Sequence, residues 1–238
     1  MLLILPDRLA FVFIAYFVAG PLDNNCYLLA PDQGRSAVVI DAPMGSAETV
    51  ENTLAEHGLE LAGVLLTHGH LDHCAEAARL ADAHGAPVFV AAADRRLLSR
   101  PEDAFSADLI AQLPLLMPEP LSEPRLVELY EPDSPLLIGG LRFTVLPAPG
   151  HTPGSVLLRT STGEHEIAFT GDVLFAGSIG RTDLPGGDDP AMRASLRDVV
   201  RALPPQVQVL PGHGPFSTMA VELAGNPYLT DAYVEALN

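Results

Sequence analysis

The stretch that decides the fold is Ala62-Gly63-Val64-Leu65-Leu66-Thr67-His68-Gly69-His70-Leu71-Asp72-His73. Its first five residues form a short apolar run, which is typical of a strand buried on both faces. Three imidazoles and one carboxylate follow directly, at the strand end, where functional groups of layered α/β proteins collect. His68 and His70 are two residues apart and can point to the same side of an extended loop. The stretch therefore predicts a buried strand with metal ligands directly after its end.

Asp72 and His73 lead into an alanine-rich segment, 75–83, for which we expect a helix. An aspartate suits a helix start, both as a cap and by its interaction with the helix dipole. These residues could instead be solvated loop histidines and a capping aspartate. Three of the eight histidines of the chain lie in this one run, however, and this spacing favours metal binding.

Composition limits the classes of function. The chain has 238 residues, 48% of them hydrophobic, and a formal net charge of −17. We expect a single domain over residues 1–238, because this length can bury one large core. The sequence contains no lysine, and its 13 basic residues are all arginines. Since binding to nucleic acid requires clustered Lys and Arg, we expect a small-molecule substrate and no nucleic-acid partner.

The apolar segment 9–19 raises the question of a signal peptide or membrane anchor. It is too short to span a bilayer, which takes about 20 residues, and Asp7 and Arg8 cancel where a secretory signal would be positive. We expect opening strands here and no membrane association. Cys26 and Cys74 are too few for a disulfide framework, which favours buried thiols and a cytoplasmic location.

Apolar runs and helical patterns repeat in two halves of similar rhythm. In the first half we expect strands at 11–18, 25–30, 37–41, 62–66 and 87–91 and helices at 47–57 and 75–83. In the second half we expect strands at 126–129, 141–146, 155–160, 166–170 and 207–210 and helices at 191–202 and near the C-terminus. Prolines at positions 101, 114, 118, 120 and 124 exclude one long helix between the halves. Residues 100–125 are therefore predicted to be a loop or lid insertion, with a helical piece near 104–113.

Three motifs in the second half place a metal-binding residue type after an apolar strand. They are Pro149-Gly150-His151-Thr152-Pro153-Gly154, Thr170-Gly171-Asp172 and Pro211-Gly212-His213-Gly214-Pro215. Glycine lets the backbone bend sharply where a side chain must point at an ion. Each motif alone is also typical of an ordinary turn. Together with the first run, the motifs supply five histidines and two aspartates.

This donor set predicts a catalytic site for two metal ions. Zinc, iron and manganese accept neutral imidazole and carboxylate, and seven such donors suit two ions that share a bridging carboxylate. Structural zinc sites usually close on four cysteine-rich ligands, which these motifs do not offer. We expect two divalent ions, zinc in the first place, with iron or manganese as alternatives.

On these motifs, the chain resembles the metallo-β-lactamase superfamily. The resemblance covers nearly the whole chain, and its His-x-His-x-Asp-His motif is highly specific. It implies an α/β fold, an αββα sandwich of two similar βα halves with the metal site at the edge of the sandwich. It also implies a first ion held by His68, His70 and His151, a second held by Asp72, His73 and His213, and a bridge formed by Asp172.

Within the superfamily, the sequence is most similar to the short bacterial branch of the glyoxalase II group, the hydroxyacylglutathione hydrolases. The likeness rests on segments 24–27, 150–154, 170–175, 180–187, 210–215 and 226–229. The chain departs from longer members, which hold the glutathione carboxylates with basic residues including a lysine. It also has Asp41-Ala42-Pro43 where the family often has Asp-Pro-Gly, a change to which we attach little functional weight.

This resemblance implies hydrolysis of a thioester, such as S-lactoylglutathione or a related hydroxyacyl thioester. A hydroxide bridging the two ions would attack the carbonyl, because metal binding lowers the pKa of water from about 15.7 to roughly 7. Asp72, itself a ligand, would orient this hydroxide. Arg181 and Asp183 are substrate candidates in the following glycine-rich loop, although we prefer to interpret them as an ion pair that braces the loop.

Other functions stay open. A persulfide dioxygenase carries a similar histidine-rich run but binds one iron by two histidines and an aspartate, and the motif around His213 favours the two-metal hydrolase. Lactonase or β-lactamase activity is a weaker alternative, since class B lactamases commonly use a cysteine where Asp172 stands. A non-catalytic, metal-stabilised scaffold is disfavoured because all the candidate ligands are present. The thiol carrier and the oligomeric state are not determined by the sequence.

Overall fold

The computed structural model describes residues 12–31, 35–106, 121–131, 134–161, 163 and 165–236. Within them, twelve strands form two six-stranded sheets, with the orders β1-β2-β3-β4-β5-β6 and β12-β11-β10-β9-β8-β7. The strands of the first sheet are β1 (Val12–Ala19), β2 (Asn24–Pro31), β3 (Ser36–Ile40), β4 (Glu60–Leu65), β5 (Val88–Val90) and β6 (Val127–Leu129). Those of the second are β7 (Leu136–Ile138), β8 (Leu141–Pro147), β9 (Val156–Ser161), β10 (Glu166–Gly171), β11 (Gln208–Pro211) and β12 (Ser217–Thr218).

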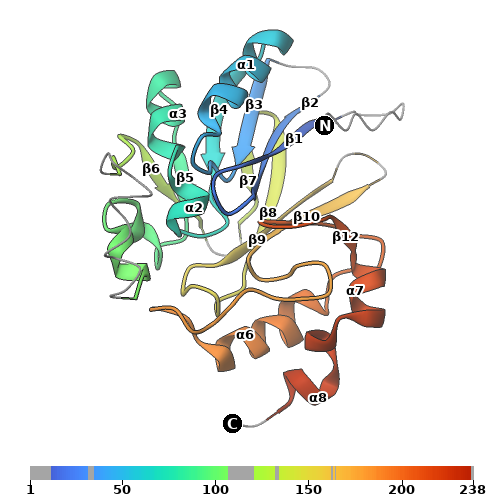
Figure 1. The fold of residues 1–238 in the computed structure, drawn as a ribbon. Helices are drawn as coiled ribbons and strands as arrows, with labels where there is room; N and C mark the ends of the chain where they lie inside the picture. The colour runs from blue at the N-terminus through green and yellow to red at the C-terminus, as the bar shows by residue number, and fades with distance from the viewer. Residues whose placement is uncertain are drawn as a thin grey trace.

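Helices cover the two outer faces of the paired sheets. The helices of the first half are α1 (Ala47–His57), α2 (Leu71–Cys74) and α3 (Ala77–His84), followed by the 3₁₀ turns η1 (Arg95–Leu98) and η2 (Pro101–Ala104). Those of the second half are α6 (Asp189–Ser195), the π-helical η3 (Leu196–Val200), α7 (Met219–Gly225), η4 (Pro227–Leu229) and α8 (Asp231–Val234). Figure 1 shows α1 and α3 on one side of the molecule and α6 and α8 on the opposite side. The layers are thus helix, sheet, sheet and helix, and the predicted αββα sandwich is confirmed.

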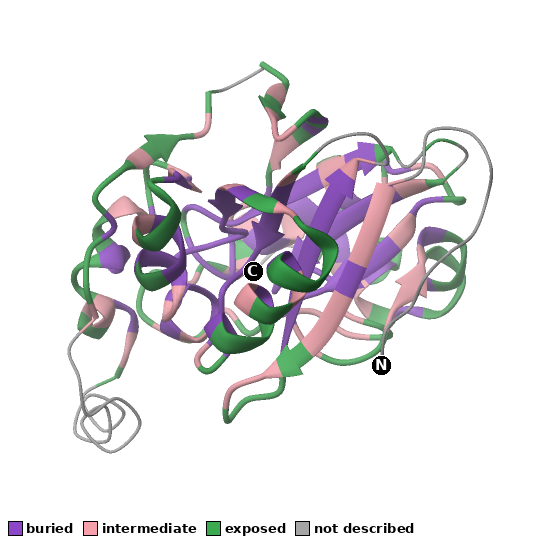
Figure 2. Ribbon diagram, turned by 90° about the horizontal axis from the view of Figure 1, so that it is seen from above, coloured by how far each residue is buried: buried purple, intermediate pink, exposed green. Residues whose placement is uncertain are grey.

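Three apolar clusters hold these layers together, and strand residues divide between them by alternation. In β2, Cys26 and Leu28 pack toward the helices, whereas Tyr27 and Leu29 pack into the layer between the sheets. In β10, Ala168 faces the second helix layer and Phe169 the layer between the sheets. A strand with both faces buried needs an unbroken apolar run, which explains the runs seen in the sequence. Figure 2 shows buried strands at the centre of the molecule and helices whose outward surfaces are exposed around them.

Each half contains a parallel strand pair joined through a helix. β3 and β4 are parallel and α1 connects them, while β10 and β11 are parallel and are connected through α6 and η3. Parallel neighbours end at the same edge of a sheet, so the segments that follow them meet there. This arrangement puts the motifs of both halves at one edge of the sandwich, as predicted.

The structure corrects several element boundaries. The helix predicted at 75–83 is present as α3, Ala77–His84, and a separate short helix, α2, precedes it. The two do not join because the main chain between them bonds elsewhere: Glu76 N donates to Ala42 O, and Ala42 N donates to His73 O. The predicted helix at 191–202 begins at Asp189 and becomes π-helical from Leu196. The short strands β7 and β12 were not expected from the sequence.

Two sequence predictions fall partly outside the described residues. Positions 107–120 of the predicted insertion, and with them most of the helical piece near 104–113, are not described, nor are residues 9–11 of the first apolar segment. In the part of the chain that is described, no helix is long and apolar enough to cross a membrane. Cys26 and Cys74 are both buried and free.

Candidate metal centre

Four strand ends deliver the candidate ligands to one edge of the sandwich. Thr67 to His73 follow β4, and His151 lies in the loop between β8 and β9. Asp172 comes directly after β10, and His213 follows β11. All seven residues predicted from the sequence are brought together in this way, although they lie up to 145 positions apart, from His68 to His213.

The first group of donors consists of three buried histidines. His68, His70 and His151 are 1%, 5% and 4% exposed, and their ligand atoms lie within 4.8 Å of one another. The Nε2 atom of each has no hydrogen-bond partner among the described residues. Three unpartnered nitrogens that converge in this way have the arrangement of an imidazole metal site.

A second group consists of Asp72, His73 and His213. His73 Nε2 lies 3.5 Å from Asp72 Oδ2 and 3.3 Å from His213 Nε2, and the latter lies 3.3 Å from Asp72 Oδ2. The side chains of Asp72 and His213 are each 23% exposed, whereas His73 is fully buried. The site is therefore open to solvent on the side of Asp72 and His213.

Asp172 lies between the two groups. Its Oδ1 is 3.3 Å from His73 Nε2, and its Oδ2 is 3.6 Å from His151 Nε2 and 3.5 Å from His213 Nε2. One carboxylate thus faces donors of both groups. This is the position that a carboxylate bridging two ions requires.

Hydrogen bonds on the far side of the rings fix how the histidines present their nitrogens. His73 Nδ1 donates to Asp41 Oδ2 at 2.9 Å, His151 Nδ1 to Arg181 O at 2.7 Å, and His213 Nδ1 to Leu22 O at 2.9 Å. Because Nδ1 carries a proton in each case, Nε2 is the nitrogen that can bind an ion, after losing its own proton where the ring is protonated. Metal-ligating histidines in proteins are oriented in the same way.

Unpartnered buried atoms test whether metal ions fit here. His68 Nε2, His70 Nε2, His151 Nε2 and Asp172 Oδ1 are all buried without a hydrogen-bond partner among the described residues. A buried polar atom left unsatisfied costs about 1–3 kcal/mol, so four in one cluster need a partner that they can share. A divalent cation is such a partner, and the donor set of imidazole and carboxylate suits zinc, iron or manganese.

Burial and charge set the protonation states of the cluster. Burial lowers the pKa of His68 well below its usual value and that of His70 to about 3, so both rings are neutral and ready to bind a cation. Burial alone would lower the pKa of His73 too, but the carboxylates of Asp172, Asp72 and Asp41 outweigh it and raise that pKa.

The pKa values of the two carboxyl groups, Asp72 and Asp172, are lowered, although burial alone would raise them. Burial would raise the pKa of Asp72, but His73, His213 and Asn24 outweigh it and lower that pKa. For Asp172, His73 and the neighbouring histidines likewise outweigh burial and lower the pKa. Both carboxylates are therefore ionised at neutral pH and can serve as ligands.

Asp41 is more important to the site than its sequence context indicated. Its carboxylate accepts hydrogen bonds from Thr67 N at 2.8 Å, Thr67 Oγ1 at 2.7 Å and His73 Nδ1 at 2.9 Å. Its own backbone has a φ of 55°, which is unusual for a residue with a side chain. Asp41 thus connects the residue before His68 to His73, a role that the sequence analysis did not assign to it.

Asp94 was missed in the sequence. It is fully buried, and its carboxylate accepts from Gly69 N at 2.8 Å, Thr152 Oγ1 at 2.7 Å and Gly154 N at 2.8 Å. These donors belong to the loops that carry His68 and His70 on one side and His151 on the other. An acidic residue soon after the buried strand β5 was the signal that could have found it.

Glycines at the centre leave room for these side chains. A Cβ at position 212 would overlap Asp172 Oδ1 and His73 Cε1, and one at position 154 would overlap the carboxylate of Asp94. The glycines of the motifs therefore permit close packing as well as sharp turns.

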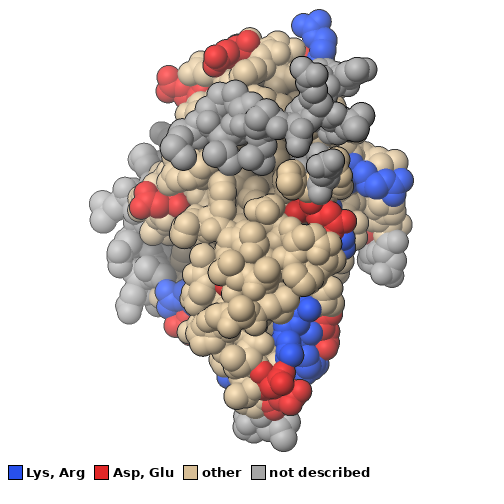
Figure 3. Space-filling view, turned by 90° about the vertical axis from the view of Figure 1, so that its right-hand side faces the viewer, with Lys and Arg blue, Asp and Glu red and all other residues tan. Residues whose placement is uncertain are grey.

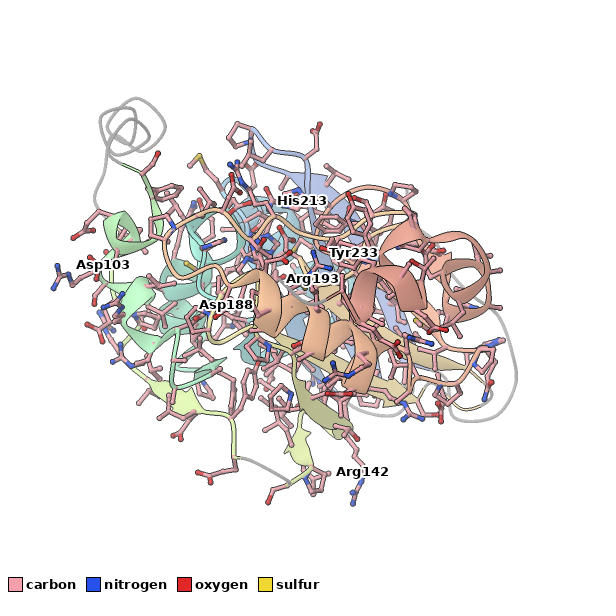
Figure 4. All side chains as sticks on the ribbon, turned by 90° about the horizontal axis from the view of Figure 1, so that it is seen from below. Asp103, Arg142, Asp188, Arg193, His213 and Tyr233 are labelled. Atoms are coloured by element: carbon pink, nitrogen blue, oxygen red, sulfur yellow. The ribbon has the colours of Figure 1, made fainter. Side chains whose placement is uncertain are left out.

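Arg181 and Asp183, the two substrate candidates, pair with each other. Arg181 Nε lies 2.6 Å from Asp183 Oδ1 and Nη2 lies 2.8 Å from Oδ2, on an exposed part of the loop. The main chain of Arg181 contributes to the centre, because its carbonyl accepts the Nδ1 proton of His151. The start of α6 holds the same region, since Asp188 N donates to Gly150 O, and Figure 4 shows Asp188 at that helix end.

A family model described as the metallo-beta-lactamase superfamily matches residues 19–213. The chain therefore belongs to the metallo-β-lactamase superfamily, whose sandwich fold and histidine-aspartate cluster it shows.

Three relatives illustrate the range of this similarity. The hydroxyacylglutathione hydrolase GloC of Haemophilus influenzae is 35% identical over 211 residues, which cover 87% of this chain and 92% of that protein. The crystal structure of BLEG-1 B3 metallo-β-lactamase is 34% identical with a TM-score of 0.76, covering 91% of this chain and 99% of that one. The di-iron-bound crystal structure of TTHA1623 is 36% identical with a TM-score of 0.74, covering 90% and 99%.

Proposed function

We propose that this protein is a binuclear metallohydrolase that cleaves a hydroxyacyl thioester such as S-lactoylglutathione. The observation that carries the proposal is the position of Asp172 between two complete donor groups, with Oδ1 3.3 Å from His73 Nε2 and Oδ2 3.6 Å from His151 Nε2. The similarity to a hydroxyacylglutathione hydrolase supports the substrate class.

In this assignment each ion has its own set of ligands. His68, His70 and His151 would hold the first ion, Asp72, His73 and His213 would hold the second, and Asp172 would contact both. When bound, such ions supply a Lewis acid and lower the pKa of water from about 15.7 to roughly 7. We propose zinc as the resident metal, and the di-iron form of one relative supports iron as the first alternative.

The protonation states of the chain favour a leaving group that departs as an anion. Asp72 and Asp172 both have a lowered pKa, so at neutral pH they accept hydrogen bonds but cannot protonate a leaving group. A thiolate departs readily because thiols titrate near about 8.5. The nitrogen of an amide needs a proton, which supports a thioester as the substrate.

We propose that Asp72 orients the attacking water. Its side chain is 23% exposed on the open side of the centre, and Asn24 Nδ2 donates to its Oδ2 at 2.9 Å. A carboxylate fixed in this way has lone pairs left for the proton of an incoming water molecule. Asp72 would combine this role with that of a ligand.

The second donor group weighs against the single-iron alternative. A persulfide dioxygenase would need two histidines and one aspartate, whereas Asp72, His73 and His213 form a further group with separations of 3.3 to 3.5 Å. A β-lactamase is the second candidate, because the structural similarity to the B3 enzyme BLEG-1 covers 99% of that chain at 34% sequence identity.

Many arginines of the described residues are already paired with Asp or Glu. They are therefore less available to bind the carboxylates of a thiol carrier. Figure 3 shows that, on the face drawn, several basic side chains of the described residues lie beside acidic ones, and ion pairs such as Arg197–Asp198 and Arg201–Asp231 agree with this. Arg181 is one of the paired arginines. We therefore propose that the acyl end, next to the ions, contributes more to recognition than the charged ends of the thiol.

Turnover of a substrate panel tests this function. The purified protein should hydrolyse S-lactoylglutathione faster than a lactone or a β-lactam, and Asp172→Ala should lose activity together with one or both ions. Faster hydrolysis of the β-lactam would favour the second candidate. Full metal occupancy without turnover of any panel member would favour a non-catalytic scaffold.

A further inference from the structure

The side chain of Asn24 lies inside the second donor group. Asn24 is the first residue of β2 and is fully buried. Its Nδ2 atom is 2.9 Å from Asp72 Oδ2 and 3.2 Å from both His73 Nε2 and His213 Nε2. The amide therefore contacts all three donors that would hold the second ion.

These distances match the spacing of ligands around one ion. The three donors are 3.3 to 3.5 Å from one another, and the amide atom is nearly as far from each. With Asp172, Asn24 would be a fifth ligand of this ion, and neighbouring ligands with bonds of about 2.0–2.2 Å lie about 2.9–3.4 Å apart in four- and five-coordinate sites. The amide thus stands at the separation expected of a further ligand.

The other end of the same amide is unsatisfied. Asn24 Oδ1 is buried and has no hydrogen-bond partner among the described residues. Rotation of the amide by half a turn exchanges its oxygen and nitrogen with almost no change in shape. The nitrogen end donates to Asp72 Oδ2. Beside a cation bound by Asp72, His73 and His213, the orientation that points Oδ1 of Asn24 toward the cation would be favoured.

The backbone holds this side chain firmly against the His213 loop. Asn24 forms an isolated bridge with His213, and Asn25 N donates to Gly212 O at 2.7 Å. The amide of Asn25 points elsewhere, to Pro211 O and Gly214 O at 2.9 and 3.0 Å. Two adjacent asparagines therefore have different tasks, one facing the donors and one holding the loop.

We propose that Asn24 is a further ligand of the second ion and binds it through Oδ1. The inference rests on the proposed two-ion site and adds an oxygen donor from the opening strand of the first sheet. It assigns to β2 a direct part in holding the ion, in addition to the loops that follow β4, β10 and β11.

Zinc affinities of Asn24 variants test this ligand. In Asn24→Leu, which keeps the size but removes both amide atoms, the second Zn²⁺ should bind at least about tenfold more weakly in chelator competition, with the first unchanged. Asn24→Asp supplies an oxygen donor again and should restore the affinity. If the residue only donates a hydrogen bond to Asp72, the aspartate would repel Asp72 and affinity would fall as in the leucine variant, which would overturn the proposal.

Controls separate this result from damage to the fold or failure of the two-ion site. Asn25→Leu and Asn25→Asp control for loosening of the His213 loop: both should lower thermal stability, and any loss of zinc affinity in the leucine variant should not be restored in the aspartate variant. In a crystal structure of the zinc-loaded protein, Asn24 Oδ1 should lie within about 2.0–2.6 Å of an ion. Two bound ions with the amide oxygen farther away would refute only the role of Asn24 as a ligand. A single bound ion would refute the two-ion site on which the proposed function rests.

Discussion

Asp94 positions the loops of the first donor group and is not itself one of the donors. Its buried carboxylate joins Gly69 N to Thr152 Oγ1 and Gly154 N, and so sets the distance between the loops of His70 and His151. Such partners behind the ligands orient them, and their loss typically weakens metal binding about 10–100-fold.

The variant Asp94→Asn should therefore weaken the first ion selectively. An amide keeps the size of the carboxylate but replaces one acceptor by a donor that faces Gly69 N or Gly154 N. We expect about 10–100-fold lower affinity for the first ion and a smaller effect on the second. Chelator competition on the purified variant measures both. An equal loss at the two ions would contradict a role confined to these loops.

The protonation of the histidines predicts a difference in pH dependence between the two ions. His68 and His70 have a lowered pKa and release no proton when the first ion binds at neutral pH. His73 and His213 have a raised pKa, so the second ion must displace protons from them.

Acid should consequently weaken the second ion before the first. As the pH falls through the raised pKa values, each proton that must be displaced changes the second affinity by about tenfold per pH unit. Titrations with Zn²⁺ at pH 6 and pH 8 should show a steep change for the second ion and a shallow one for the first. The reverse order would refute the assigned protonation states.

At the scale of elements, α6 holds the loop of His151 from outside the centre. Asp188 caps this helix by accepting a hydrogen bond from Ala191 N at 2.9 Å, and its own N–H bonds Gly150 O at 2.8 Å. Arg193 on the same helix stacks over Tyr233, 4.0 Å from the ring centre, as Figure 4 also shows.

The variant Asp188→Ala removes the cap but keeps the backbone bond. Loss of an aspartate cap typically costs about 1 kcal/mol of unfolding free energy, and we expect a loss of this size with both metal affinities unchanged. Denaturant unfolding measures it. As a control, Asp198→Ala, which removes an exposed partner of Arg197, should not change stability measurably. Loss of an ion in Asp188→Ala would mean that the cap itself shapes the centre.

Helices and strands could be predicted from the sequence where a local pattern of residues was enough to specify them. The apolar runs of β2, β3, β4 and β10 are recognisable because both faces of these strands are buried. The break between α2 and α3 was not, because it depends on bonds between Glu76, Ala42 and His73, which only the tertiary structure brings together. Short edge strands such as β12 carry too few residues for a pattern.

The same distinction holds for the site. A motif with several metal-binding residue types in one short run can be recognised from the sequence alone, as in His68 to His73. The remaining candidate ligands were recognised from the glycine-rich turns around them. Asp94 stands alone in the sequence, and only the fold shows that its carboxylate lies between two ligand loops. The spacing of Asn24 from Asp72, His73 and His213 is likewise a property of the folded chain.

At the scale of the whole molecule, the centre joins the two halves of the sandwich. His68, His70, Asp72 and His73 come from the first half, and His151, Asp172 and His213 come from the second. Bound ions would cross-link these halves in the folded state only, and so stabilise it.

Removal of the ions should lower the thermal stability of the protein. An ion present at 100 times its dissociation constant contributes about 2.7 kcal/mol, which for a chain of this size corresponds to a fall in Tm of about 5–10 °C. Calorimetry with and without a chelator measures the change, and added Zn²⁺ should reverse it. An unchanged Tm would show that the ions do not hold the halves together.

The most direct test of the two-ion account is the metal content of the purified protein, measured together with oxygen uptake. The account predicts two divalent ions per chain, hydrolysis of S-lactoylglutathione and no oxygen consumption. In His213→Ala, one ion should be lost and the ion at His68, His70 and His151 should stay. A single iron per chain with oxygen uptake would contradict the account and favour a persulfide dioxygenase.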